Sequence, residues 1–218
     1  MPRNNGSRPQ GPLIKMADYV RIHAIIRAVL DGVEANAPKA CVFFSMAGAY
    51  LLSKHHRLNA KPMAGAAFYC VGGDPPNALS YARFEGEEIV SDDDAFHCWV
   101  ECDGWAIDFM APLFGDALRQ LQPDIRVSKR MFQRPLSTMT DTVDLRKGGD
   151  FLLLPNPVLT AAVLARALRK PATGDLAEIC AHWYRPTPKR IDERLAMGSD
   201  DGSVSTLQMK LPQLSGAW

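Results

Sequence analysis

Residues 94–109 read Asp-Ala-Phe-His-Cys-Trp-Val-Glu-Cys-Asp-Gly-Trp-Ala-Ile-Asp-Phe, and this stretch constrains the fold more than any other. Two runs of aromatic and branched residues flank Asp103-Gly104, which is a strong signal for a two-residue β-hairpin turn because both central positions need a positive φ. With this turn, Cys102 lies opposite Trp105. The sequence therefore predicts a tight antiparallel hairpin.

The two faces of this hairpin differ in chemistry, because side chains alternate along a strand and directly opposed residues share a face. One face is apolar and is predicted to be the core: Cys98, Val100, Cys102, Trp105, Ile107 and Phe109. The other face carries His97, Trp99, Glu101, Ala106, Asp108 and Met110. On it, His97 and Asp108 are diagonal neighbours about 7 Å apart at the backbone, within reach of a hydrogen bond. A histidine oriented by an aspartate is two thirds of a nucleophilic triad.

Cys41 is the candidate nucleophile. Helical spacing predicts an amphipathic helix over residues 15–36, and a second, buried helix after Asn36 that carries Cys41 in its first turn. A helix N-terminus and a neighbouring imidazolium both stabilise a thiolate. Taken singly, a buried free cysteine or a lone histidine on a strand is usually structural. Together, the three residues favour catalysis, with Cys41 as nucleophile, His97 as proton shuttle and Asp108 as the group that fixes the tautomer.

The order of these features resembles the transglutaminase-like branch of the papain-like cysteine peptidase superfamily, in which some bacterial proteins are placed. The matching segments are Cys41, residues 58–65, residues 97–101 and residues 105–108. The resemblance covers roughly residues 36–112. It implies a cysteine hydrolase or acyltransferase that forms a covalent acyl-enzyme at Cys41 and needs no metal or organic cofactor. The implied substrate is a peptide, a protein or a small amide or thioester.

Two further residues are candidates for substrate binding. Trp99 shares the face of His97 and is predicted to wall a substrate groove, although core packing fits an aromatic residue equally well. Asn36 lies five residues before Cys41 and is a candidate for the oxyanion hole. Helix capping is the commoner role of asparagine, and backbone N–H groups at Cys41 could supply the hole alone.

Two other functions stay open. One is a catalytically silent member of the fold that binds a peptide or protein partner in the same groove. The other is a thiol redox sensor, which would need a resolving thiol near Cys41, and the sequence shows no obvious one.

The composition limits the remaining function classes. A net charge of +1 argues against a general nucleic-acid binder, and no apolar run reaches the roughly 20 residues of a membrane span. The polar N-terminus does not resemble a secretory signal, so the five cysteines are expected to be free thiols in the cytoplasm. No metal site is predicted, because Cys98 and Cys102 would lie more than about 10 Å apart on a strand. The oligomeric state is not predicted.

The predicted fold is α+β, with N-terminal helices packed on an antiparallel β-sheet, and the resemblance implies a papain/transglutaminase-like core. Residues 1–12 are predicted to be a disordered leader, residues 13–155 the core, and residues 156–218 a helical C-terminal extension packed on it. A charged helix is predicted over residues 189–197. The acidic run at residues 85–94 is interpreted as solvated turns, the alternative being an acidic lip that raises the pKa of His97.

Overall fold

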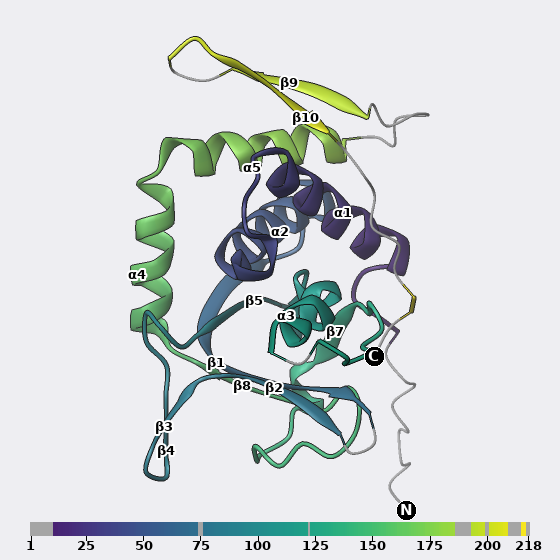
Figure 1. Ribbon diagram of the computed structural model, residues 1–218, viewed down its shortest axis with the longest axis vertical. Coiled ribbons are helices and arrows are strands. Elements are labelled where there is room, and N and C mark those ends of the chain that lie inside the picture. Colours follow the sequence, from purple (N-terminus) through teal and green to yellow (C-terminus); the bar gives the residue numbers. More distant parts are fainter. Residues whose placement is uncertain are drawn as a thin grey trace, which may run out of the picture.

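A layer of helices covers a curled antiparallel sheet in the computed structural model (Figure 1). The structure describes residues 11–73, 76–121, 123–185, 193–198, 201–208 and 215–216. Helices α1, α2 and α5 lie on one side of the sheet, and α4 runs from the sheet toward α5 (Figure 1). The predicted α+β class is confirmed.

Six strands form the main sheet, in the order β2-β1-β5-β6-β7, with β8 also paired to β1. The strands are β1 (Ala60–Gly72), β2 (Asn77–Tyr81), β5 (His97–Cys102), β6 (Trp105–Asp108), β7 (Phe132–Pro135) and β8 (Phe151–Pro155). The long β1 pairs with β5 through residues 60–65 and with β2 through residues 67–72. Consequently the last residue of β2 and the first residue of β5 lie close together along β1.

Helix α2 is the central helix of the fold. It spans Cys41–His56 and packs on β5, β1 and α5, and a short 3-10 helix, η1 (Ala37–Lys39), precedes it. Helix α1 spans Met16–Gly32 and ends earlier than predicted. Because η1 takes up the residues after Asn36, α2 begins at Cys41, which therefore lies in the first turn of this helix as predicted.

The hairpin of β5 and β6 has the predicted turn and register. Asp103 and Gly104 both have positive φ, 48° and 78°, and Cys102 pairs with Trp105. Its face pattern departs from the prediction, because the face that carries His97 is also buried. Trp99 and Ala106 on that face are 0% exposed. This hairpin is therefore covered on both sides, and its second face is not an open surface.

Gly48 allows α2 to approach the end of this hairpin closely. A Cβ atom at Gly48 would lie 2.3 Å from Cδ2 of Phe109. The Phe109 ring also packs against Tyr19 of α1, with ring centroids 5.0 Å apart. The missing side chain thus lets α1, α2 and the residues after β6 meet in one buried cluster.

Half of the acidic run takes part in surface ion pairs, namely Glu85, Asp92 and Asp93. A small hairpin, β3 (Arg83–Glu85) and β4 (Glu88–Val90), projects from the sheet (Figure 1). Arg83 of this hairpin pairs with Asp92, and Arg166 of α4 pairs with Asp93 at 2.7 Å. The pairs agree with the interpretation as solvated turns. The shorter connecting elements are η2 (Ala111–Leu113), α3 (Phe114–Leu121) and η3 (Leu136–Thr138).

The C-terminal part is only partly helical. Helices α4 (Pro157–Leu168) and α5 (Pro171–Tyr184) are followed by a hairpin of β9 (Arg194–Gly198) and β10 (Val204–Gln208). The charged helix predicted over 189–197 is therefore wrong from residue 194 onward, and residues 189–192 lie outside the described part. The alternating exposure of β9 explains the difference, because period-two burial is that of a strand. Of the predicted leader, residues 1–10 also lie outside the described part.

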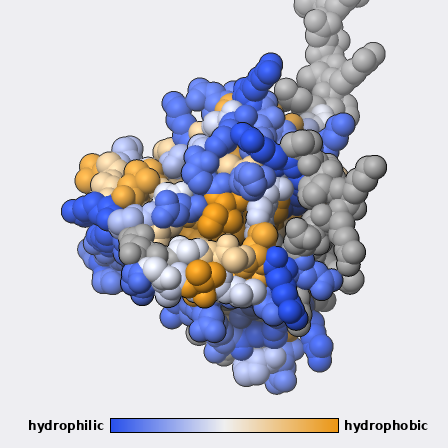
Figure 2. All heavy atoms as spheres, turned by 90° about the horizontal axis from the view of Figure 1, so that it is seen from above, coloured by the Kyte–Doolittle hydropathy of each residue, from blue (hydrophilic) through white to orange (hydrophobic). Residues whose placement is uncertain are grey.

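The β9–β10 hairpin lies over α5, and the two elements line an open pocket of about 440 Å³. Leu207 is buried there, directly beside Gly32 of α1. From this side, hydrophobic residues gather in patches on a mostly hydrophilic face (Figure 2). The hairpin thus extends the helical layer outward and stays away from the main sheet.

Candidate active site

Three elements bring the predicted triad together: α2 supplies Cys41, β5 supplies His97, and β6 supplies Asp108. The Nε2–H of His97 donates to Oδ2 of Asp108 at 2.7 Å, so the predicted hydrogen bond across the hairpin is confirmed. The second oxygen of Asp108, Oδ1, accepts the backbone N–H of Met110 at 2.9 Å. Both carboxylate oxygens therefore have a donor, which fixes the orientation of the carboxylate.

The second ring nitrogen of His97 is the atom left for Cys41. Nδ1 is buried and has no regular hydrogen-bond partner among the described residues, while Nε2 is held by Asp108. The thiol of Cys41 interacts with the His97 side chain through a hydrogen bond and through charge. His97 thus lies between a carboxylate and a thiol, which is the arrangement of a nucleophile, a base and an orienting group.

The environment of Cys41 favours the thiolate. A hydrogen bond from the Cys98 thiol and the interactions with His97 outweigh burial, and together they lower the pKa of Cys41 to about 5. Position at the first residue of α2 adds the favourable end of the helix dipole. Cys41 as a whole residue is buried, with 8% of its surface exposed.

His97 is held in the protonated form by its two partners. Burial alone would lower the pKa of its ring, but the charge and hydrogen bond of Asp108, followed by those of Cys41, raise the pKa to about 10. The acidic run at residues 85–94 is not among the causes of this shift. The interactions at the site therefore favour a thiolate at Cys41 and an imidazolium at His97.

Cys98 belongs to the site, and the sequence analysis missed it. Strand alternation assigned Cys98 to the face opposite His97, whereas interactions with the side chain and backbone of Cys98 help to lower the pKa of Cys41. Cys41 and Cys98 lie on elements that pack against each other, α2 and β5. This crossing is a tertiary feature that strand periodicity does not contain.

Aromatic rings enclose the imidazole. Tyr81, the last residue of β2, stacks on His97 with centroids 4.5 Å apart and planes 24° from parallel. Tyr69 and Phe114 contact the imidazole edgewise at 5.7 and 5.9 Å. Burial, followed by the nearby charge of Asp108, raises the pKa of both tyrosines, so both hydroxyls are neutral. Tyr81 lies beside His97 because β2 and β5 both pair with β1, and a prediction of this position needs that pairing.

Helix α1 holds the end of β6 in place. The Tyr19 hydroxyl donates to the backbone carbonyl of Asp108, and Nδ1 of His23 donates to that of Phe109 at 2.7 Å. Burial lowers the pKa of His23 to about 4, so its ring is neutral, while its Nε2 is buried without a hydrogen-bond partner among the described residues. These two residues fix the backbone that carries the orienting carboxylate.

The two predicted substrate-binding residues do not lie in an open groove. Trp99 is 0% exposed and its Nε1–H donates to Glu101 at 3.1 Å, so the groove-wall interpretation is wrong and the packing alternative is correct. Asn36 is exposed, precedes η1 and makes no side-chain capping hydrogen bond. Since η1 separates Asn36 from α2, the structure does not bring its amide to Cys41, and it does not bear out the capping role either.

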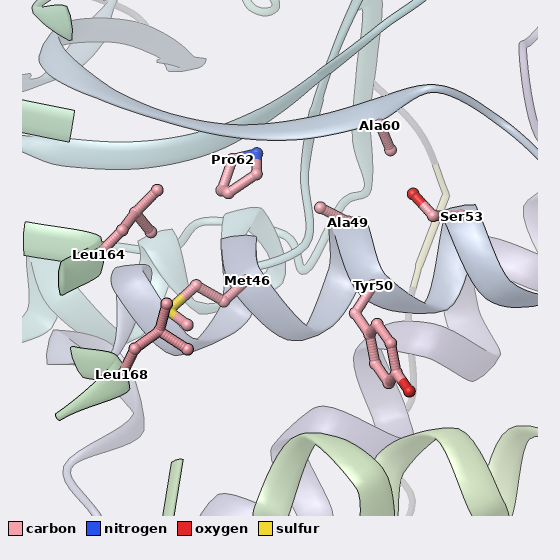
Figure 3. A pocket seen from close by; sticks show the side chains of 8 residues that line it. All are labelled: Met46, Ala49, Tyr50, Ser53, Ala60, Pro62, Leu164 and Leu168. Atoms are coloured by element: carbon pink, nitrogen blue, oxygen red, sulfur yellow. The ribbon is translucent and has the colours of Figure 1, made fainter. Parts of the chain in front are cut away.

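A separate apolar groove runs along the flank of α2. It has a volume of about 240 Å³ and is lined by Met46, Ala49, Tyr50, Ser53, Ala60, Pro62, Leu164 and Leu168 (Figure 3). None of the triad residues lines it. Within the described ranges, no three or more His, Cys, Asp or Glu side chains are grouped to hold a metal ion. Nor does any described helix have the length and apolar character needed to cross a membrane.

Fold and site together define an α+β protein with a buried Cys-His-Asp cluster. The chain belongs to the family described as "Protein of unknown function (DUF2026)", whose model matches residues 15–218. It is also similar to a crystal structure described as that of a genomics target, with 38% sequence identity and a TM-score of 0.83. That match covers 96% of this chain and 98% of the other. Comparison with curated proteins finds no match.

Proposed function

We propose that this protein is a cysteine hydrolase or acyltransferase built on a papain/transglutaminase-like core. Cys41 is the nucleophile, His97 the proton shuttle and Asp108 the orienting carboxylate. The observation that carries the proposal is the buried 2.7 Å hydrogen bond from His97 Nε2 to Asp108, which leaves Nδ1 for the Cys41 thiol. The substrate is an amide, ester or thioester of a peptide, a protein or a small molecule.

The proposed reaction has two steps. The Cys41 thiolate attacks the carbonyl carbon, so that a C–S bond forms and an oxyanion develops. Backbone N–H groups of the first turn of α2 lack helical partners and donate to this oxyanion. The leaving group takes the proton of His97 as its bond to the carbonyl breaks, which yields an acyl-enzyme. Water or an amine, deprotonated by His97, then releases the acyl group and regenerates the thiolate.

The chain supplies all the groups used in these steps. His97 is protonated when the leaving group needs a proton and neutral when the second nucleophile must lose one. Asp108 keeps the ring in one tautomer throughout, because the carboxylate can only accept from Nε2–H. A reducing compartment such as the cytoplasm, expected from the sequence, would keep the five free thiols reduced.

One observation favours a second candidate, a catalytically silent fold that binds a peptide or protein partner. His97 is 0% exposed and Asp108 is 1% exposed. A histidine buried in this way can serve packing as well as catalysis. The two candidates differ in the chemistry of Cys41, because a binding module does not need an activated thiol.

Site-resolved alkylation separates these candidates. The native protein is treated with iodoacetamide from pH 5 to pH 9, and modification of each cysteine is followed by peptide mass spectrometry. We expect Cys41 to react fastest and to remain reactive far below the free-thiol pKa of about 8.5. His97→Ala should slow it, whereas His182→Ala, at an exposed position on α5, should not.

A second arm tests acyl transfer itself. The protein is incubated with p-nitrophenyl acetate and with a small acyl thioester, and the intact mass is measured. An acetyl group mapped to Cys41 and absent in Cys41→Ala supports the proposal. If Cys41 alkylates no faster than Cys102 and accepts no acyl group from either donor, the enzyme proposal is wrong and the binding module stands.

A further inference from the structure

The hydroxyl of Tyr19 bridges the ends of β6 and β7. Asp108, the last residue of β6, is paired with Phe132, the first residue of β7. The Tyr19 hydroxyl donates to the backbone carbonyl of Asp108 and accepts the backbone N–H of Phe132 at 3.2 Å. All three residues are at most 2% exposed. One side chain of α1 therefore joins two buried backbone groups that belong to paired residues of the sheet.

Asp108 is held at three points, and each bond limits the others. Its carbonyl accepts from Tyr19, its Oδ2 accepts from Nε2–H of His97 at 2.7 Å, and its Oδ1 accepts the N–H of Met110 at 2.9 Å. Strand β6 ends at this residue, so the pairing of β6 with its neighbours does not extend beyond it. Because hydrogen bonds weaken steeply with poor geometry, a displaced Asp108 backbone would loosen the bond from its carboxylate to His97.

The segment that carries Tyr19 is itself tied to β7. The N–H of Ile14 donates to Oε1 of Gln133 at 3.1 Å, and Nε2 of Gln133 donates to the Ile14 carbonyl at 2.8 Å. Gln133 follows Phe132 directly on β7, so the N-terminal segment contacts two consecutive residues of this strand. The Tyr19 ring also packs on Phe109 with centroids 5.0 Å apart. These contacts leave the hydroxyl one position relative to the end of the sheet.

We propose that Tyr19 is a positioning residue of the site, whose hydroxyl holds the backbone of Asp108 where its carboxylate orients His97 and so supports the reactivity of Cys41. This inference rests on the proposed function and adds to it a residue 89 positions away from Asp108. Burial, followed by the charge of Asp108, raises the pKa of Tyr19, so the hydroxyl keeps the proton that it donates.

Removing this hydroxyl alone should weaken the activation of Cys41. In Tyr19→Phe the ring stays, but the carbonyl of Asp108 and the N–H of Phe132 lose their common partner, and the backbone must shift to satisfy them. Burial lowers the pKa of His97, and the charge and hydrogen bond of Asp108 raise it. A loosened carboxylate should therefore make His97 less basic and stabilise the Cys41 thiolate less.

Iodoacetamide alkylation from pH 5 to pH 9 and acylation by p-nitrophenyl acetate measure this effect. In Tyr19→Phe we expect the alkylation midpoint of Cys41 to rise by about half to one pH unit, with an acylation rate about threefold to tenfold lower below that midpoint. 3-Fluorotyrosine at position 19, which keeps the hydroxyl, should restore the native midpoint. Tyr184→Phe is the matched control, because that hydroxyl contacts His56 and Asp18 instead.

A double-mutant cycle shows whether Tyr19 acts through Asp108. In an Asp108→Asn background, Tyr19→Phe should no longer move the midpoint, because the carboxylate that it positions is absent. A shift of equal size in both backgrounds would overturn the proposal. So would a Tyr19→Phe protein that melts at a lower temperature with an unchanged midpoint, since its hydroxyl would then serve stability only.

Nuclear magnetic resonance of the native protein gives a second measurement that needs no variant. We expect a slowly exchanging Tyr19 hydroxyl proton with a nuclear Overhauser effect to the Phe132 amide proton, and the absence of this contact would overturn the proposal. The alkylation result also separates the two inferences. A native Cys41 that reacts like Cys102 would overturn the proposed function and this role with it, whereas an activated Cys41 that is insensitive to Tyr19→Phe would overturn the role alone.

Discussion

The Nε2 atom of His97 lies 2.7 Å from Oδ2 of Asp108, and the two side chains are 0% and 1% exposed. A buried pair of this kind stabilises the fold only while both partners are present, because removing one leaves an uncompensated polar group or charge. Here the carboxylate has a further donor, the N–H of Met110. Asp108 therefore links the chemistry of the ring to the backbone after β6, and its replacement should alter both.

Asp108→Asn should weaken the activation of Cys41. The charge and hydrogen bond of Asp108 are the main influences that raise the pKa of His97, so an amide should lower that pKa and in turn raise the pKa of Cys41. We expect the alkylation midpoint of Cys41 to move upward by more than about one pH unit and any acyl turnover to fall about 10²–10⁴-fold. Asp116→Asn, at a surface ion pair with Arg119, is the matched control. An unchanged alkylation midpoint of Cys41 in Asp108→Asn would contradict an influence of Asp108 on Cys41 through His97.

Cys41→Ala should change the pH dependence of stability. The pKa of Cys41 is depressed in the folded protein, from 9.0 to about 5, so this thiol contributes stability that is present above pH 9 and lost as pH falls through 5. The advantage of the native protein over Cys41→Ala should therefore grow from pH 5 toward pH 8, with a slope of up to about 1.4 kcal/mol per pH unit.

Urea unfolding at pH 5.5, 6.5 and 7.5 would measure this slope for both proteins. Cys180→Ala is a suitable control, because burial raises the pKa of that thiol and it is neutral over this range. A difference between native protein and Cys41→Ala that stays constant with pH would contradict a depressed pKa of Cys41.

Gly48→Ala should destabilise the protein although alanine favours helices. Its Cβ would lie 2.3 Å from the Phe109 ring, and the ring is confined by Tyr19. We expect a loss of about 1–3 kcal/mol from overpacking. Gly174→Ala in α5 is the matched control, since nothing lies within 4 Å of its Cβ, and it should stabilise by about 0.5–1 kcal/mol. If both variants shift the urea midpoint of the native protein in the same direction, the steric argument is refuted.

Tyr81→Phe and Tyr81→Ala should separate the ring from its hydroxyl. The hydroxyl is buried without a described partner, so Tyr81→Phe should change stability by less than about 1 kcal/mol and leave the alkylation rate of Cys41 intact. Tyr81→Ala removes the ring stacked on His97 and should cost about 2–4 kcal/mol. Thermal unfolding and iodoacetamide kinetics at pH 7 give both readouts. Slower alkylation in Tyr81→Phe would assign the hydroxyl a direct role at the site.

The local signals in the sequence were sufficient for the hairpin and for its polar pair. Asp103-Gly104 determines a two-residue turn, the turn determines the register, and the register places His97 within hydrogen-bonding distance of Asp108. These steps act over a few residues, where turn geometry and strand periodicity leave little freedom. The buried character of α2 followed from the same kind of local pattern.

Other features depended on which elements pack together. The exclusion of Trp99 from any open groove follows from the covering of both sheet faces, and the ring of Tyr81 over His97 follows from two strands sharing β1. The position of Cys98 against Cys41 follows from the crossing of α2 and β5. Periodicity within a segment reports which side of that segment is apolar, but not which distant segment covers it. The sequence by itself thus determined the orienting pair of the site, whereas only the tertiary structure decided what surrounds the nucleophile.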